Sequence, residues 1–128
     1  MSDLDHARQM LAIARRDLKA LGGMLDTDVF AYEIFGFQAQ QTAEKALKAW
    51  IAVLGGSYGF TDDLGLLLDS LNILGADCTR FSDLLDLTIF AVHFRYDDAG
   101  DDSGFPEREE VLEKVTKLVA HVEQVLSL

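Results

Sequence analysis

The chain has 128 residues, of which 49% are hydrophobic and 26% are charged, and this balance excludes an intrinsically disordered protein. Its length fits a single domain, residues 1–128, and leaves little room for a second one. The formal net charge of −11 disfavours DNA as a partner and RNA over a broad surface, because an acidic protein repels phosphate backbones. We find no apolar stretch long enough for a membrane span and no secretory signal, so we expect no membrane partner. The single cysteine, Cys78, allows no disulfide framework, and we therefore expect a reducing, cytoplasmic location.

The first predicted helix starts at Ser2 or Asp3, which can cap it, and ends near Gly22 and Gly23. Its basic residues fall on the side that we expect to face solvent. Its apolar residues recur at three- and four-residue steps and form one stripe, made of Leu4, Ala7, Leu11, Ala14, Leu18, Leu21 and Leu25. The basic residues are Arg8, Arg15, Arg16 and Lys19.

The second predicted helix runs from about Asp28 to Leu54 and stops at Gly55 and Gly56. Small alanines in the middle of its buried stripe favour the close approach of a neighbouring helix, so we expect an antiparallel hairpin with the first helix. The stripe comprises Phe35, Ala39, Ala43, Ala46, Leu47, Trp50 and Leu54. A polar stripe lies beside it, made of Gln38, Gln41, Glu44, Lys45 and Lys48.

Three further helices are predicted in the rest of the chain. Thr61 is the expected N-cap of a third helix, with Asp62 and Asp63 in its first turn. A fourth helix follows Ser82, with Leu84, Leu85, Thr88, Ala91 and Val92 inward and Arg95 continuing that face. The last helix starts near Pro106 and buries Val111, Val115, Leu118, Val122 and Leu126. The pattern predicts an all-α, up-and-down bundle of four or five helices.

We expect no metal site and no cofactor. The histidines His6, His93 and His121 belong to different helices and have no second ligand at helical spacing. The acidic loop that starts at Asp97 lacks the glycine and the glutamate that an EF-hand requires. The single cysteine, Cys78, cannot form an internal disulfide and is expected to fill the core.

Two polar clusters remain as candidates for chemistry. The first is Gln41, Glu44, Lys45 and Lys48, for which the simplest interpretation is a solvent face tied by a Glu44–Lys48 ion pair. The second surrounds Arg95 and Tyr96, where a helix ends at the acidic loop. An arginine that continues an apolar face needs an anionic partner, and two alternatives stay open. Arg95 either pairs with Glu44 or binds a ligand phosphate.

Together, the segment from Phe37 to Ala49 and the later Arg95-Tyr96 pair resemble the HEPN family (higher eukaryotes and prokaryotes nucleotide-binding). The resemblance implies a four- or five-helix bundle that is often a dimer, with its conserved polar residues near the dimer interface. It makes a nucleotide or a short RNA the expected ligand. The candidate ligand-binding residues are Arg95, Tyr96, Gln41, Glu44, Lys45 and Lys48.

Many HEPN proteins are metal-independent ribonucleases, often toxins, that are neutralised by a minimal nucleotidyltransferase encoded alongside them. Their catalytic motif has four to six residues between an arginine and a histidine, whereas Gly100, Asp101 and Asp102 occupy the corresponding positions after Arg95. An exposed aspartate titrates near 4 and cannot replace an imidazole near neutral pH. Asp62 also stands where many members have a histidine.

We therefore expect no catalytic residue. The resemblance favours a non-catalytic interaction or nucleotide-binding domain that works with a nucleotidyltransferase-type partner in a toxin–antitoxin-like system. The alternative is a divergent metal-independent ribonuclease toxin in which Arg95 stabilises the phosphorane-like charge. A third interpretation is a helical scaffold whose polar stripe is purely structural.

Overall fold

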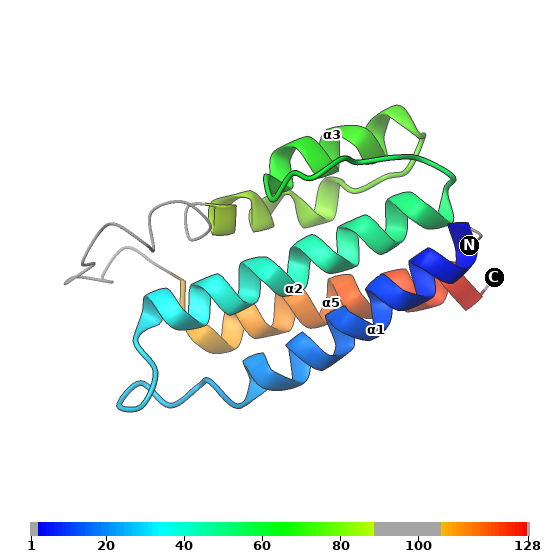
Figure 1. The fold of residues 1–128 in the computed structure, drawn as a ribbon. Helices are drawn as coiled ribbons and strands as arrows, with labels where there is room; N and C mark the ends of the chain where they lie inside the picture. The colour runs from blue at the N-terminus through cyan, green and yellow to red at the C-terminus, as the bar shows by residue number, and fades with distance from the viewer. Residues whose placement is uncertain (1–2, 89–105, 128) are drawn as a thin grey trace.

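The computed structural model describes residues 3–88 and 106–127 (Figure 1). Within these ranges the chain forms helices and no strand, so the predicted all-α bundle is confirmed. No helix in the described part is long and apolar enough to span a membrane. The elements are α1 (Asp3–Gly22), α2 (Tyr32–Val53), α3 (Leu64–Ile73), the 3₁₀ helix η1 (Thr79–Thr88) and α5 (Arg108–Ser127).

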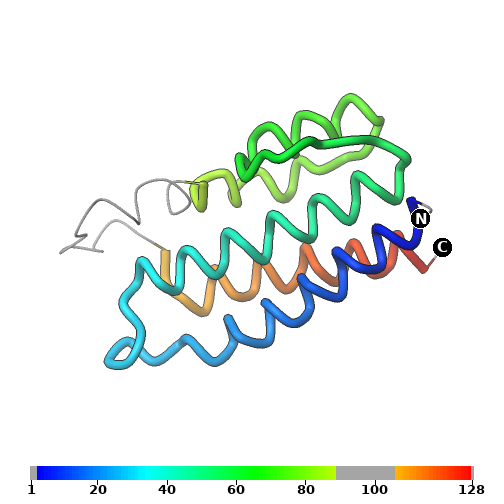
Figure 2. The backbone as a smooth tube through the Cα atoms, in the orientation of Figure 1, coloured from blue at the N-terminus to red at the C-terminus, as the bar shows by residue number. Residues whose placement is uncertain are grey.

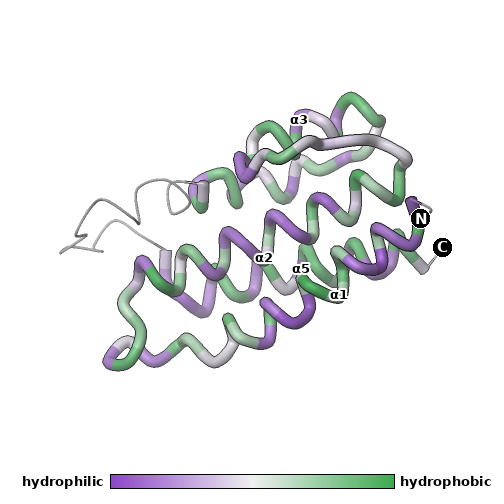
Figure 3. The backbone as a smooth tube through the Cα atoms, viewed as in Figure 1, coloured by the Kyte–Doolittle hydropathy of each residue, from purple (hydrophilic) through white to green (hydrophobic). Residues whose placement is uncertain are grey.

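The three long helices pack along one another, and α1 and α2 form the predicted antiparallel hairpin (Figure 2). α5 packs on both and runs in the same direction as α2 (Figure 1). Hydrophilic and hydrophobic residues alternate along each long helix, as expected for helices with one buried face (Figure 3). The alanines of the α2 stripe, Ala39, Ala43 and Ala46, are completely buried and let the neighbouring helices approach closely.

Most of the predicted stripes are buried. In α1, Ala7, Leu11, Ala14 and Leu21 have no exposed surface, while Leu4 in the first turn is 46% exposed. The basic residues Arg8, Arg15, Arg16 and Lys19 are exposed, as predicted. In α5, Val111, Val115, Leu118 and Val122 are buried, and Leu126 is partly buried.

The segment 54–63 runs back along α2 before α3 begins (Figure 1). Gly56 lies next to Ile51, the Tyr58 ring lies 5.2 Å from Lys48 Nζ, and the Asp62 carbonyl accepts a hydrogen bond from Gln40. A Cβ atom at Gly56 would stand 2.6 Å from Cδ1 of Leu74, so a larger residue here would require the Leu74 side chain to shift. We call residues 54–63 the return segment; it covers one face of α2.

Two predicted helix starts were wrong by a few residues. α2 begins at Tyr32 and not at Asp28, because Asp26 Oδ1 accepts a hydrogen bond from the Asp28 amide and holds this stretch in a turn. The N-cap of α3 is Asp63 and not Thr61. Asp63 Oδ1 accepts from the amides of Gly65 and Leu66, and Thr61 Oγ1 accepts from the Asp63 amide instead.

The predicted fourth helix is a 3₁₀ helix in the described part of the chain, and it begins at Thr79, before Ser82. A 3₁₀ helix has three residues per turn, so the residues on its buried face are Phe81, Leu84 and Leu87. Leu85 is 43% exposed, and its predicted inward position was wrong. The expected inward residues Ala91 and Val92 lie outside the described residues.

Cys78 fills the core, as predicted, and is 3% exposed. Its thiol lies 3.5 Å from the Leu68 carbonyl oxygen and 3.4 Å from Asn72 Oδ1, both within reach of a weak S–H donor. Burial raises the pKa of the thiol, which disfavours the nucleophilic thiolate.

Candidate functional site

The four candidate residues on α2 come together in one network. Lys45 Nζ and Lys48 Nζ lie 2.8 Å and 3.1 Å from the same oxygen of Glu44, Oε2. Lys45 Nζ also donates to Gln41 Oε1 at 3.3 Å. The predicted Glu44–Lys48 ion pair is therefore confirmed, and Glu44 has a second cationic partner. We call Gln41, Glu44, Lys45 and Lys48 the α2 polar cluster.

The α2 polar cluster is not the solvent face that the sequence favoured. The exposed fraction is 6% for the side chain of Glu44, 11% for that of Lys48 and 22% for that of Lys45. The return segment accounts for part of this burial, because the Tyr58 ring lies 5.2 Å from Lys48 Nζ. Burying ionised groups costs free energy unless other charges and hydrogen bonds compensate them. Here two ammonium groups share one carboxylate, so the cluster has one excess positive charge.

Gln40 extends the network toward α3, and the sequence reasoning missed it. Its side chain is fully buried and donates to the Asp62 carbonyl oxygen at 2.7 Å. Its own Oε1 accepts from Gln41 Nε2 at 2.7 Å. The signal that could have found it is spacing, because Gln40, Glu44 and Lys48 follow one another at four-residue steps on one face of a helix.

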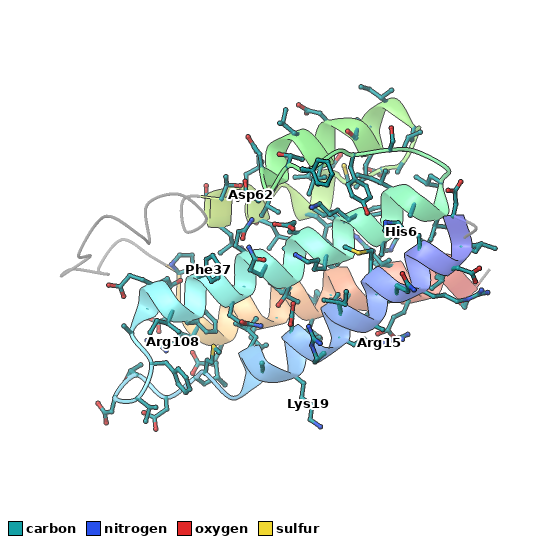
Figure 4. All side chains as sticks on the ribbon, viewed as in Figure 1. His6, Arg15, Lys19, Phe37, Asp62 and Arg108 are labelled. Carbon is teal, nitrogen blue, oxygen red and sulfur yellow. The ribbon has the colours of Figure 1, made fainter. Side chains whose placement is uncertain are left out.

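Tyr58 and His6 extend the network at the other end of α2. The Tyr58 hydroxyl and His6 Nε2 are hydrogen-bonded to each other. Burial raises the pKa of Tyr58, and the negative charge of Glu44 raises it further, so the phenol stays protonated near neutral pH. Figure 4 labels His6 and Asp62, which mark the two ends of the network along α2.

The other two candidates, Arg95 and Tyr96, lie outside the described residues, as do His93 and the acidic loop that starts at Asp97. The Arg95–Glu44 pair therefore stays a prediction. Within residues 3–88 and 106–127, no group of three or more His, Cys, Asp or Glu side chains could hold a metal ion.

A model of the HEPN domain family matches residues 7–128, which is nearly the whole chain. The chain belongs to the HEPN domain family. The resemblance carried by the α2 motif is thus confirmed, and membership supports a helical domain of the nucleotide-binding or ribonuclease type. No curated protein and no solved structure gives a significant match.

This HEPN domain has a further buried cation, Arg108, which the sequence reasoning did not single out. It is 6% exposed and donates to the carbonyl oxygens of Met24 at 2.8 Å and Phe30 at 2.6 Å. Its guanidinium also lies over the rings of Tyr32 and Phe35. Arg108 thereby ties the start of α5 to the loop between α1 and α2. Helical spacing could have indicated the burial of Arg108, because it lies three residues before Val111 and in line with the apolar stripe of α5.

Proposed function

We propose that the protein is a non-catalytic HEPN domain that binds a nucleotide or a short RNA through the α2 polar cluster together with Arg95 and Tyr96. We further propose that it acts in the cytoplasm as a homodimer, with a nucleotidyltransferase-type partner, in a toxin–antitoxin-like system. The observation that carries the ligand proposal is the arrangement of two lysines around a single, nearly buried carboxylate oxygen.

The charge balance of the cluster favours an anionic ligand. Glu44 can neutralise only one of its two ammonium partners, and the second one gains from a further negative charge. Lys45 is the more exposed of the two lysines, so a phosphate can reach it while the Glu44–Lys48 pair stays intact. The Gln41 side chain adds a polar group beside Lys45. A phosphate group matches this set of donors.

The sequence supports a non-catalytic role. Ribonucleases of this family use a histidine after the motif arginine, and Gly100, Asp101 and Asp102 occupy the corresponding positions after Arg95. Cys78 is buried with a raised pKa, so it supplies no ready nucleophile. The proposed dimer and the nucleotidyltransferase-type partner are supported by family resemblance.

A thermal-shift measurement with ATP, other nucleotides and short RNAs tests the ligand proposal. A ligand at about one hundred times its Kd stabilises the folded state by about 2.7 kcal/mol, which raises Tm by several degrees. We expect such a shift for the wild type and its loss in Lys45→Gln and in Arg95→Ala. Lys19→Gln, an exposed lysine on α1, is the matched control and should keep the full shift.

The absence of a shift with every nucleotide and RNA would contradict ligand binding. Co-purification with a nucleotidyltransferase encoded next to this protein tests the partner separately. A neighbouring nucleotidyltransferase that does not bind the purified protein would remove that part of the proposal, whatever the nucleotides do.

The second candidate function is a divergent ribonuclease, and one observation favours it. His6 is hydrogen-bonded to Tyr58, whose ring lies 5.2 Å from Lys48 Nζ, so Tyr58 connects an imidazole to the α2 polar cluster. In that case expression should arrest growth and the purified protein should cleave RNA, and both effects should disappear in Arg95→Ala and in His6→Ala. A harmless wild-type protein without RNA cleavage would exclude this function.

A further inference from the structure

A second cationic surface lies in a pocket between η1 and α5. The pocket has a volume of about 580 Å³ and is lined by Arg80, Phe81 and Asp83 of η1 and by Lys114, Lys117 and His121 of α5. This volume falls in the range of small-molecule sites. The lining carries three cationic side chains and one carboxylate, although the protein as a whole has a net charge of −11. Glu110 and Glu113 of α5 pair with two of these cations, so the feature that sets the pocket apart is its arginine.

The pocket is separate from the α2 polar cluster. Trp50 connects α2 to the pocket wall, since its ring lies 4.7 Å from that of His121 and 5.9 Å from that of Phe81. Trp50 follows Lys48 by two residues, which places the two side chains on different sides of the helix. A ligand in the pocket would thus contact different side chains from a ligand at Lys45.

The three cations of the pocket have different partners. Lys114 Nζ lies 3.1 Å from Asp83 Oδ2 and 3.7 Å from Glu110 Oε1, and Lys117 Nζ lies 3.0 Å from Glu113 Oε1. Both lysines are thus already paired with carboxylates.

Arg80 differs, because no described carboxylate lies within 4.0 Å of its guanidinium. Its Nη2 donates to His121 Nδ1 at 2.6 Å, and the guanidinium lies 4.8 Å from the centroid of the Phe81 ring. The pKa of Asp77 is lowered mainly by hydrogen bonds from Thr79, whose amide donates to the Asp77 carboxylate, and to a smaller extent by the charge of Arg80. The guanidinium has five N–H donors and therefore retains donors for an anion.

We propose that this pocket binds a small organic phosphate, with Arg80 as the principal contact for the phosphate group. A guanidinium matches phosphate oxygens in a two-pronged, charge-assisted geometry. Phe81, Leu84 and Ala120 give the pocket an apolar wall for the organic part of the ligand. The proposal is independent of the α2 polar cluster and of the proposed function.

His121 supplies a local reporter for an anion in the pocket. Its Nδ1 accepts the hydrogen bond from Arg80, so the ring is neutral in this arrangement. A phosphate bound to Arg80 would offset the positive charge that faces the imidazole, which would raise the pKa of His121. Burial is the larger cause of the lowered pKa of His121, and the charge of Arg80 is the other. Lys114 and Lys117 of α5 and Asp83 of η1 also line the pocket.

Calorimetric titration of the full chain with phenyl phosphate, at constant ionic strength and up to about 10 mM, tests the proposal. We expect saturable binding that weakens about tenfold or more in Arg80→Gln, which removes a charge-assisted hydrogen bond. Arg80 is exposed, so this variant should fold, and circular dichroism checks that it does. Lys19→Gln, which removes a charge from the exposed side of α1, is the matched control and should bind as the wild type does.

NMR titration of the His121 ring, with and without phenyl phosphate, is the second readout, and a rise in its pKa is expected on binding. The proposal is overturned if the wild type shows no saturable binding, if Arg80→Gln binds as tightly as the wild type, or if the His121 pKa stays unchanged when ligand binds. Loss of binding in Lys45→Gln alone would place the phosphate at the α2 polar cluster and would also overturn it.

Discussion

Glu44, Lys48 and Arg108 are each at most 9% exposed, and each is compensated by a different kind of partner. Glu44 and Lys48 compensate each other, with Lys45 as a second cation on the same oxygen. Arg108 has two backbone carbonyl oxygens and two aromatic rings around it. Buried charges that lose a partner destabilise a protein by several kcal/mol, so all three residues constrain the fold as well as the chemistry.

His121 makes the stability of the protein depend on pH. Burial lowers its pKa below the ordinary value of 6.5, and the charge of Arg80 lowers it further. Between the lowered pKa and 6.5 the unfolded chain therefore binds more protons at this residue than the folded chain does. The contribution of His121 to stability is fully present above pH 6.5 and is lost as the pH falls through 6.5 toward the lowered value.

We expect the wild type to lose more stability between pH 7 and about pH 5 than His121→Gln does, since most carboxylates titrate below that range. Urea unfolding at a series of pH values measures both proteins. Gln9→Ala, at an exposed and uncharged position of α1, is the control, and its pH profile should follow that of the wild type. If the stability of the wild type and that of His121→Gln changed with pH in the same way, the pH dependence could not be assigned to His121.

For single residues, the sequence predicted which side chains form the α2 polar cluster, because helical spacing places Gln41, Glu44 and Lys48 on one side of the helix. It did not predict their burial. Part of that burial comes from Tyr58 in the return segment, whose ring lies over Lys48, and local helical spacing carries no information about this contact. Arg108 was missed for a similar reason, since its partners lie in the loop between α1 and α2.

Among the elements, the start of α3 depends on one capping side chain. Asp63 Oδ1 lies 2.8 Å from the Gly65 amide nitrogen and 3.4 Å from that of Leu66, and it satisfies donors that have no partner within the helix. Asp63→Ala should lower the free energy of unfolding by about 1 kcal/mol, which urea denaturation can measure.

Asp62→Ala is the matched control for this prediction. Asp62 is exposed and contributes its backbone carbonyl, which the substitution keeps, to the bond with Gln40. Asp62→Ala should change the free energy of unfolding by no more than about 0.5 kcal/mol. If the two alanine variants were equally destabilised, Asp63 would not be the cap, and the acidic charge near the helix start would matter instead.

The elements also show where periodicity predicts well and where it fails. α1, α2 and α5 are long, so many turns show the same buried stripe, and most of the stripe residues were placed correctly. The predicted burial of Leu4 and Leu54 was wrong: they lie in the first turn of α1 and just after the end of α2, and are 46% and 39% exposed. η1 has the same kind of apolar residues but a period of three, and it therefore exposes Leu85, which α-helical spacing would place inward. The sequence of η1 contains no proline or glycine that would have signalled the change.

The molecule as a whole consists of two unequal parts in its described residues. α1, α2 and α5 contact one another pairwise and share the fully buried residues of the long stripes. α3 and η1 form a smaller layer that packs mainly on α2 and on each other (Figure 1). Three apolar residues of this layer, Leu66, Ile73 and Leu85, are exposed by 54%, 86% and 43%, so it buries less of its apolar surface.

This asymmetry predicts that the smaller layer opens first. Local opening is easiest where few apolar contacts are buried, and 3₁₀ hydrogen bonds are weaker than α-helical ones. Native-state hydrogen exchange should therefore show faster exchange at the amides of Leu67 and Leu71 in α3 than at those of Ala46 and Trp50 in α2. The difference should persist at low denaturant concentrations, where sub-global opening dominates exchange.

Equal protection in α3 and α2 would contradict this prediction and would show that the bundle opens as one cooperative unit. If the smaller layer does open first, the consequences reach both candidate sites. The return segment that covers the α2 polar cluster leads directly into α3, and η1 supplies Arg80 to the second pocket. Ligand binding at either site would then slow exchange in this layer more than in α1, because only the closed form presents the complete site.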